Sequence, residues 1–241
     1  MTRASGKIPQ ISILVGPAAG GAAYGPALTD VVILGPDGRV FVIDPDVVRS
    51  VAGENVGALR LGGPELHGYR SGVVHVVTET TEEAYERGQL LCSLLGDQGT
   101  LEVSAVQDRD LAETFPESAR RACNVHPLMV NVLDEAEHTL ELHPKWAPNI
   151  TTTLGRLGGR TVGGVTNNPM RLGGCLDSSS AEKAARFVRM CDAHGVPLIV
   201  LVDAPGYLPG VDQEWDEPVR RGAAPSCCTP LPRPRSPASP S

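Results

Sequence analysis

Short runs of β-branched and apolar residues alternate with glycine- and proline-rich turns along the first third of the chain. Such runs are typical of buried strands, and they predict strands at 10–15, 31–34, 39–43 and 73–77. Gly16-Pro17 ends the first strand in a tight turn, and Gly35-Pro36-Asp37-Gly38 joins the second and third. Small residues from Gly20 to Leu28 begin a helix, and Asp44-Pro45 caps another that reaches Val51. The N-terminal part is therefore predicted to be α/β.

A helix between two strands is the clearest unit of the second half. The strand predicted at 160–166 leads through a glycine-rich loop to a helix whose S-x-x-E capping box is formed by Ser179 and Glu182. Gly195 ends this helix, and a fully apolar strand follows at 198–202. This order predicts a parallel βαβ unit, whose ligands normally bind at the carboxyl ends of the strands.

A polar stretch in the middle of the chain and a proline-rich stretch at its end indicate the domain organisation. Residues 81–95 are helix-forming and carry a leucine stripe, whereas residues 98–127 are polar and lack periodicity, as expected of an inter-domain connection. We therefore expect one domain at 1–115, a connection at 116–127 and a second domain at 128–223. Residues 224–241 contain six prolines and almost nothing apolar, so we expect a disordered tail there. That tail is either a polyproline ligand for an aromatic groove or the product of out-of-frame translation.

Composition excludes several functional classes. The 241 residues are 41% hydrophobic and carry a net charge of -7 with acidic and basic residues interspersed, which argues against a nucleic-acid partner. No apolar run approaches the length of a membrane span. The six cysteines and six histidines show no metal-ligand spacing, so we expect no metal, no disulfide framework and a cytoplasmic location. The histidines are expected at the surface or in hydrogen bonds.

Phosphate-loop, serine-elbow and metalloprotease motifs are absent from the sequence. The first candidate for function is therefore a site formed by the backbone amides of glycines. Gly20 and Gly21, flanked by Ala19 and Ala22, stand where a strand and a turn lead into a helix. We expect their N–H groups to point outward, unpaired by the helix, as an oxyanion hole requires. A side chain there would obstruct an approaching carbonyl. The alternative is a glycine pair that serves only a tight turn.

The loop after the apolar strand is the second candidate. It reads Asp203-Ala204-Pro205-Gly206-Tyr207-Leu208-Pro209-Gly210, and its two prolines and two glycines make it rigid. Free amides at Gly206 and Tyr207 would bind an oxyanion. Such a charge-free site suits a reaction in which the substrate or cofactor supplies its own base. The alternative is an ordinary strand-exit turn.

A succession of motifs from about Ile8 to about Ala223 resembles one known family. The motifs are Gly16-Pro17-Ala18-Ala19-Gly20-Gly21-Ala22-Ala23-Tyr24-Gly25-Pro26-Ala27-Leu28-Thr29-Asp30, Pro45-Asp46-Val47-Val48, Leu61-Gly62-Gly63, Ser71-Gly72-Val73, Gly159-Arg160-Thr161-Val162-Gly163, Gly174-Cys175-Leu176-Asp177, Ala185-Arg186-Phe187-Val188-Arg189 and the loop 202–210. In this order they resemble the carboxyltransferase (β) subunit of biotin-dependent acetyl- and propionyl-CoA carboxylases, closest to the actinobacterial type.

The resemblance implies a crotonase-like (ClpP/crotonase) α/β fold with parts of two related domains, the first for acyl-CoA and the second for biotin. It also implies that the biotin enolate removes the α-proton of the thioester and that the acyl enolate captures carbon dioxide. By position, Ala19, Gly20, Gly21 and Ala22 would bind the acyl-CoA substrate, and Gly20 and Gly21 would stabilise its enolate. Pro205, Gly206 and Tyr207 would bind biotin, with the Gly206 and Tyr207 amides stabilising its enolate.

Partners follow from the same resemblance. Biotin would be carried by a partner protein rather than attached to this chain, and the partners would be a biotin carboxylase and biotin carrier subunit and further copies of the chain. The family assembles its sites between subunits, so we expect exposed apolar surface. Compared with the family, the chain looks truncated at both ends, Asp44 replaces a usual glycine, and Glu217-Pro218 replaces Gly-Val. We therefore expect a fragment that is inactive alone.

Two alternative functions stay open. Another crotonase-like acyl-CoA enzyme, a hydratase or decarboxylase, would need a catalytic carboxylate near the thioester, and no Asp or Glu adjoins Gly20 or Gly21 in the sequence. A non-catalytic binding module would act through the proline-rich tail at 224–241. The sequence does not distinguish acetyl from propionyl or longer acyl groups.

Overall fold

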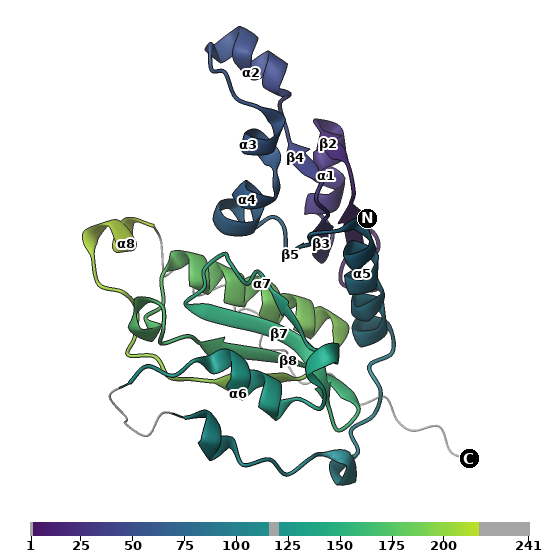
Figure 1. The fold of residues 1–241 in the computed structure, drawn as a ribbon, viewed down its shortest axis with the longest axis vertical. Helices are drawn as coiled ribbons and strands as arrows, with labels where there is room; N and C mark the ends of the chain where they lie inside the picture. Colours follow the sequence, from purple (N-terminus) through teal and green to yellow (C-terminus); the bar gives the residue numbers. More distant parts are fainter. Residues whose placement is uncertain (1, 116–120, 217–241) are drawn as a thin grey trace.

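The computed structural model describes residues 2–115 and 121–216. The expectations for the tail at 224–241, for Glu217-Pro218 and for part of the connection at 116–127 lie outside these residues. Within them the chain is a mixed α/β protein whose N-terminal elements lie above the C-terminal sheet in the view of Figure 1.

Strands and helices alternate along the chain. The strands are β1 (Ile11–Leu14), β2 (Pro17–Ala19), β3 (Val31–Leu34), β4 (Arg39–Phe41), β5 (Val76–Val77), β6 (Leu140–Leu142), β7 (Ile150–Leu157), β8 (Arg160–Asn167) and β9 (Leu198–Leu201). The α-helices are α1 (Gly21–Ala27), α2 (Pro45–Ala52), α3 (Ala58–Gly62), α4 (Pro64–Leu66), α5 (Thr81–Gly96), α6 (Val125–Val132), α7 (Ser178–His194) and α8 (Val211–Trp215). A π-helical turn covers His67–Ser71, and 3-10 turns cover Val103–Ala105, Leu111–Thr114, Ala136–His138 and Leu172–Gly174.

The N-terminal half contains two small parallel sheets. One has the order β1-β3-β5, and its central strand β3 is completely buried, as expected for a short apolar run. The other pairs β2 with β4. The turn between β3 and β4 forms as predicted, with the Gly38 amide donating to the Gly35 carbonyl at 3.0 Å. The two strands that it joins nevertheless enter different sheets. Pro17, predicted to lie in a tight turn with Gly16, is instead the first residue of the strand β2.

The C-terminal half contains a four-stranded sheet in the order β6-β7-β8-β9. The predicted βαβ unit is confirmed, since β8 and β9 are parallel and α7 connects them. Two antiparallel strands, β6 and β7, extend the sheet and were missed by the sequence interpretation. The reason is that β7 contains threonines at 151–153, which are buried although they are polar. The strand therefore lacks the apolar run by which a strand buried on both faces is recognised in a sequence.

Helices cover both faces of this sheet, as consecutive glycines in β8 show. A side chain at Gly163 would lie 2.9 Å from the Cys191 sulfur of α7, and one at Gly164 would lie 2.5 Å from the Met129 sulfur of α6. Because successive residues of a strand face opposite sides, α7 and α6 pack on opposite faces. Glycine at both positions allows both helices to approach the strand closely.

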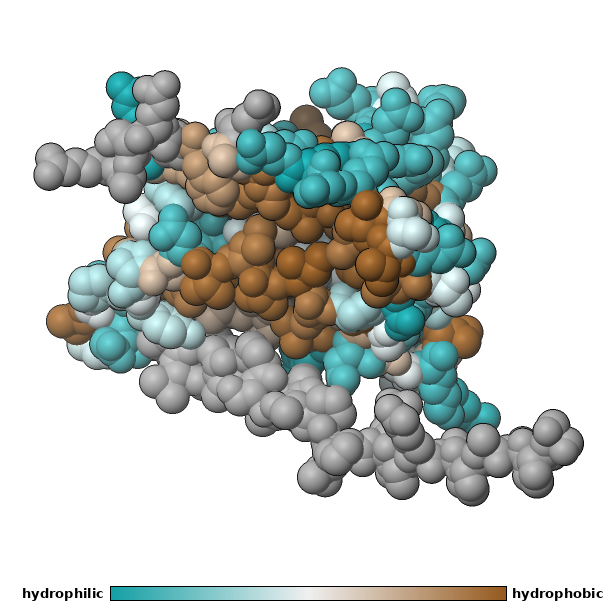
Figure 2. Space-filling model, turned by 90° about the horizontal axis from the view of Figure 1, so that it is seen from below, coloured by the Kyte–Doolittle hydropathy of each residue, from teal (hydrophilic) through white to brown (hydrophobic). Residues whose placement is uncertain are grey.

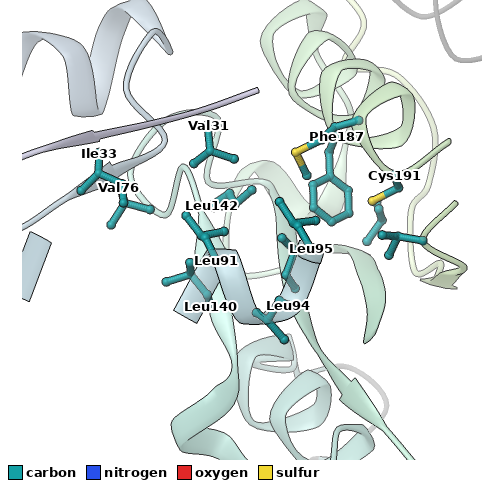
Figure 3. Close-up of a cluster of buried hydrophobic side chains, with 14 of the residues drawn as sticks. Val31, Ile33, Val76, Leu91, Leu94, Leu95, Leu140, Leu142, Phe187 and Cys191 are labelled. Atoms are coloured by element: carbon teal, nitrogen blue, oxygen red, sulfur yellow. The ribbon is translucent and has the colours of Figure 1, made fainter. Parts of the chain in front are cut away.

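One hydrophobic cluster joins the two halves of the chain. Leu91, Leu94 and Leu95 of α5 are buried, as the leucine stripe predicted. In Figure 3 they lie between Val31 of β3 on one side and Phe187 of α7 on the other. The expected boundary at 116–127 therefore separates two regions that share part of their core, and the domain division stays a prediction.

The helix α7 begins two residues earlier than the capping expectation required. Its N-cap is Asp177, whose side chain accepts from the Ser180 amide at 2.8 Å, while the Ser180 hydroxyl accepts from the Asp177 amide at 2.8 Å. The predicted box of Ser179 and Glu182 is therefore wrong, because Asp at N-cap competes at least as well as serine. The predicted end is correct, since Gly195 takes a left-handed conformation with φ 69°.

Apolar surface is exposed on the underside of the molecule. In the sheet formed by the described residues, β9 is the last strand, and it leaves Leu198 and Val200 exposed, with Val202 following. Seen from below, hydrophobic residues form a broad area of the surface (Figure 2). This exposure agrees with the expectation of apolar surface and marks a face suited to further contacts.

Candidate functional site

The first candidate site lies where β2 runs into α1. Pairing of β2 with β4 sets Ala19 beside Phe41, and the next residue turns the chain into the helix. Gly20 makes this turn with φ 57° and ψ -127°, a combination that is unfavourable for residues with a side chain. Glycine at this position is therefore required by the backbone itself.

The backbone amides that are free at this turn are not the two that the sequence predicted. The Gly20 amide donates to the Phe41 carbonyl at 3.1 Å, so it is occupied, and the prediction that both glycine amides point outward unpaired is wrong for Gly20. Gly21 and Ala22, the first two helical residues, are exposed, and their amides have no acceptor among the described residues. A side chain at Gly21 would point into open space. The two donors open to an incoming oxyanion are therefore Gly21 and Ala22.

An apolar cavity of about 420 Å³ lies alongside α1. Its wall includes Ala23 and Tyr24 of α1 and Val40 of β4 and contains no carboxylate. His67 also lines it, but both ring nitrogens are engaged, with the Ser71 hydroxyl at 2.7 Å and the Val40 carbonyl at 2.6 Å. The cavity thus offers apolar surface and no free histidine or carboxylate base.

The second candidate site is the loop that follows β9. Leu176 pairs with Tyr207 in an isolated parallel bridge, in which the Leu176 amide donates to the Gly206 carbonyl at 2.9 Å and the Leu208 amide donates to the Leu176 carbonyl at 2.7 Å. The amides of Gly206 and Tyr207 themselves have no acceptor within the described ranges. Pro205 and Tyr207 are exposed, and Gly206 has φ 136°. Among the residues that the structure describes, both amides are therefore free, as the sequence predicted.

A neighbouring loop supports this second candidate. A side chain at Gly174, which has φ 79°, would lie 2.8 Å from the Asp203 carbonyl, so the two loops are in close contact. Asn149 joins them to α7, because its amide donates to the Cys175 carbonyl at 2.9 Å and to the Asp177 carboxylate at 3.3 Å. The sequence interpretation missed Asn149, whose only signal is a polar residue next to a strand start.

The two candidate sites do not meet within one chain. Figure 1 shows β2 and α1 at the upper right, and α8, with the loop that precedes it, at the left. The residues Ala19, Gly20, Gly21 and Ala22 are brought together, and so are Pro205, Gly206 and Tyr207, but as two separate groups.

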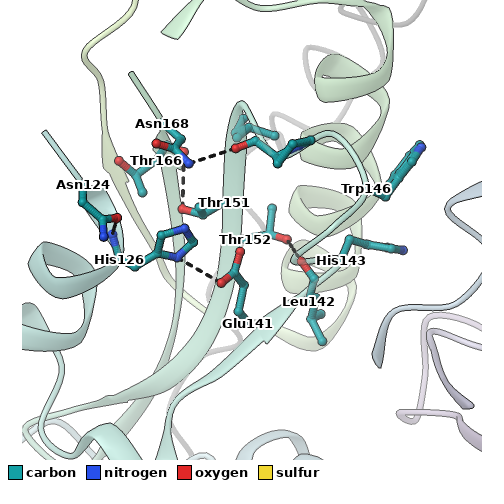
Figure 4. A network of polar contacts seen from close by, with 12 residues as sticks. Asn124, His126, Glu141, Leu142, His143, Trp146, Thr151, Thr152, Thr166 and Asn168 are labelled. Atoms are coloured by element: carbon teal, nitrogen blue, oxygen red, sulfur yellow. Dashed lines mark hydrogen bonds and ion pairs between the residues drawn. The ribbon is translucent and has the colours of Figure 1, made fainter. Parts of the chain in front are cut away.

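The histidines are mostly held in hydrogen bonds, as expected. His126 lies 3.1 Å from the Glu141 carboxylate (Figure 4), and hydrogen bonding to Glu141 raises its pKa. His143 extends on the other side of the network, next to Trp146. Among the described residues, no group of three or more His, Cys, Asp or Glu side chains is arranged to hold a metal ion. Nor is any helix in the described ranges long and apolar enough to cross a membrane.

Comparisons with known proteins agree with the resemblance seen in the sequence. The chain is 59% identical over 225 residues to the biotin-dependent acetyl-/propionyl-coenzyme A carboxylase beta6 subunit of Mycobacterium tuberculosis, covering 92% of this chain and 48% of that protein. It is 55% identical over 228 residues to the propionyl-CoA carboxylase beta chain of Rhodococcus erythropolis, with the same coverage of 92% and 48%. The chain spans about half the length of the curated relatives that it matches.

A solved structure shows the same fold. The crystal structure of transcarboxylase 12S, a hexamer solved with methylmalonyl-coenzyme A and methylmalonic acid bound, superposes with a TM-score of 0.84 at 37% identity. The match covers 92% of this chain and 45% of that one. The expected crotonase-like α/β carboxyltransferase fold is confirmed. Residues 1–225 match the carboxyl transferase domain, and the chain therefore belongs to the carboxyl transferase domain family.

Proposed function

We propose that this chain provides part of the carboxyltransferase component of a biotin-dependent acyl-CoA carboxylase, which moves CO2 from carboxybiotin to the α carbon of acetyl-CoA or propionyl-CoA. The observation that carries the proposal is the pair of free amides at Gly21 and Ala22, beside an apolar cavity without a free histidine or carboxylate base. Fixed amide donors stabilise a thioester enolate as its charge develops.

The absence of a carboxylate in the cavity wall matches this chemistry. A hydratase or decarboxylase of the same fold would need a catalytic carboxylate at the thioester, and the described cavity wall has none. In the proposed reaction, biotin supplies the base once its carboxyl group has left as CO2. The chain then contributes orientation and enolate stabilisation, through Gly21 and Ala22 for the acyl group.

Biotin would be placed by the loop with Pro205, Gly206 and Tyr207. Its free Gly206 and Tyr207 amides are suited to the oxygen of the biotin enolate, in the same way as the first pair serves the acyl enolate. Because the two groups lie apart in one chain, the proposal requires that acyl-CoA bound at one group meets biotin bound at a second copy of the chain.

The partners follow from this arrangement. Biotin would arrive on a biotin carrier subunit served by a biotin carboxylase, and further copies of the chain would complete the sites. The broad apolar surface is consistent with such assembly (Figure 2). The four described cysteines are free, which fits a cytoplasmic location.

A chimaera tests the proposal. Residues 8–216 of this chain would replace the matching segment of the Mycobacterium tuberculosis beta6 subunit, and formation of malonyl-CoA or methylmalonyl-CoA would be measured with the carrier and carboxylase subunits. We expect the chimaera to be active. Its Gly21→Val variant should lose about 100-fold in kcat, because the valine side chain would fill the open space beside the free amides and keep the enolate oxygen away from them.

Gly57→Val is the matched control, because a side chain there also meets open space and its backbone has φ -81°. It should keep full activity. A correctly assembled chimaera without activity, or a Gly21→Val variant as active as the control, would refute the proposal. The 241-residue chain alone should form neither product, and turnover by it would show that one chain completes a site.

A further inference from the structure

A second cavity, of about 370 Å³, lies between the end of α1 and α7. It shares Ala27 with the apolar cavity beside α1, but its wall contains none of the candidate residues at 19–22 or 205–207. Asp30, His75, His143, Lys183, Arg186 and Arg189 provide its polar wall. Leu142, Phe187 and Met190 provide apolar wall. The cavity therefore combines a cluster of titratable side chains with apolar surface, and the function proposed above uses none of them.

His75 and His143 form a fixed pair in this wall. Both are at least 95% buried, and their ring centroids are 4.2 Å apart. The Nδ1 atom of His75 accepts from the Val32 amide at 3.1 Å, so the proton of the neutral ring resides on Nε2. That Nε2–H group has no acceptor in the described part of the chain, and His75 lines the cavity. It is a buried donor without a partner in the wall of the cavity.

His143 presents the complementary group. Its Nε2 atom lies 3.0 Å from the Gly72 carbonyl and donates to it in the neutral ring, which leaves Nδ1 as an acceptor. Burial, together with the nearby charge of Arg186, lowers the pKa of both histidines, that of His143 to about 3, so both rings are neutral at pH 7. The pair therefore offers one donor and one acceptor side by side.

Positive charge surrounds this pair. Arg186 donates to the same Gly72 carbonyl at 2.7 Å, and Lys183 donates to four backbone carbonyls. The wall contains three cationic side chains against the carboxylate of Asp30, and Glu182 adds a second carboxylate beside Arg186. Glu141 also acts electrostatically on Lys183, so the positive and negative side chains around the cavity nearly balance. Binding of an anion would therefore depend on the free His75 donor beside the Arg186 guanidinium group, and the wall suits a ligand with at most one negative charge.

We infer that the cavity lined by His75, His143 and Arg186 binds a small monocarboxylate with a short apolar body. The carboxylate would accept from His75 Nε2–H and from the guanidinium group, and the apolar body would lie against Leu142, Phe187 and Met190. A dianion such as phosphate is disfavoured, because the nearly balanced charges of the wall would not neutralise it and because it would meet the Asp30 carboxylate. This inference is independent of the proposed carboxyl transfer.

The test is a titration of the 241-residue chain, labelled with ¹⁵N, at pH 7 and constant ionic strength. Long-range ¹H–¹⁵N spectra report each imidazole during addition of sodium butyrate, of butyramide as the neutral counterpart, or of inorganic phosphate. We expect saturable shifts of His75 and His143 with butyrate alone, while His138, an exposed histidine outside the cavity, stays unchanged. No saturation, equal shifts with butyramide, or tighter binding of phosphate than of butyrate would overturn the inference.

Variants locate the site. Arg186→Gln and His75→Phe should each weaken butyrate binding about tenfold or more, the usual effect of losing a hydrogen bond to a charged group. Arg186→Lys should recover part of the affinity. The matched control is Arg156→Gln, which removes an arginine outside the cavity. If a variant fails to fold, the titration of the unaltered chain still decides. Unchanged affinity in folded Arg186→Gln would place the ligand elsewhere.

Discussion

The Nζ atom of Lys183 lies 2.7 Å from the carbonyl oxygen of Ile150, deep inside the protein. The same ammonium group also donates to the carbonyls of His143, Trp146 and Ala147, and its side chain is 1% exposed. Two of these residues, His143 and Ala147, have positive φ angles. One buried cation from α7 therefore holds the irregular segment that connects β6 to β7.

Lys183→Met should destabilise the fold. The substitution leaves carbonyl acceptors buried without a donor, and removing one partner from a buried polar network typically costs about 3 kcal/mol. The free energy of unfolding in urea, monitored by tryptophan fluorescence, measures the loss because Trp146 lies in the held segment. Lys145→Met, an exposed lysine in the same segment, is the control and should cost little. Equal stability of both variants would contradict the role assigned to Lys183.

Acid should destabilise the protein partly through His143. Burial lowers its pKa from 6.5 to about 3 in the folded state, so between these values the unfolded chain binds a proton that the folded chain does not. Stability contributed by the neutral ring is therefore present above pH 6.5 and is lost as pH falls towards 3, by about 2 kcal/mol at pH 5.

Urea unfolding at pH 7 and pH 5 checks this expectation. His143→Gln should show a smaller loss of stability between the two pH values than the unaltered chain. His138→Gln, which changes an exposed histidine, should keep the full loss. If His143→Gln retains the same pH dependence, the acid sensitivity comes from other groups, such as the buried His75.

Gly20→Ala and Gly21→Ala should differ although the residues are adjacent. Gly20 has φ 57° and ψ -127°, so alanine there would cost about 1 to 3 kcal/mol. Gly21 is helical and a side chain there meets open space, so alanine should leave stability unchanged or raise it slightly. Thermal unfolding of both variants measures the difference. A Gly20→Ala variant as stable as Gly21→Ala would show that the turn relaxes without strain.

Asp177→Ala should destabilise α7 by about 1 kcal/mol, because the side chain caps the Ser180 amide and also accepts from Asn149. Ser179→Ala, at the position where the sequence pattern suggested the cap, should change stability by a few tenths of a kcal/mol at most. Hydrogen exchange of the first-turn amides of α7 locates the effect. Faster exchange in Ser179→Ala than in Asp177→Ala would restore the capping box predicted from the sequence.

The sequence by itself determined those helices and strands that are specified by residues close together in the chain. Three features could be recognised in this way: the apolar run of β3, the leucine stripe of α5, and the βαβ unit of β8, α7 and β9. In each, the pattern of apolar residues within a short segment indicates both the type of element and its buried face. The succession of glycine-rich motifs also predicted the family, which the relatives confirm. The free amides at Gly206 and Tyr207 were predicted from a rigid loop.

Only the tertiary structure decided what depends on pairing across the chain. It assigned β3 and β4 to separate sheets, and it engaged the Gly20 amide with Phe41, twenty-one residues away, so that Gly21 and Ala22 carry the free donors. It also brought His75 against His143 and buried Lys183 beneath backbone carbonyls. Hydrogen bonds between distant segments produce no periodic pattern in the sequence. Nothing in the residues around either partner indicates the contact, which forms only when packing brings the two groups together and removes water from both.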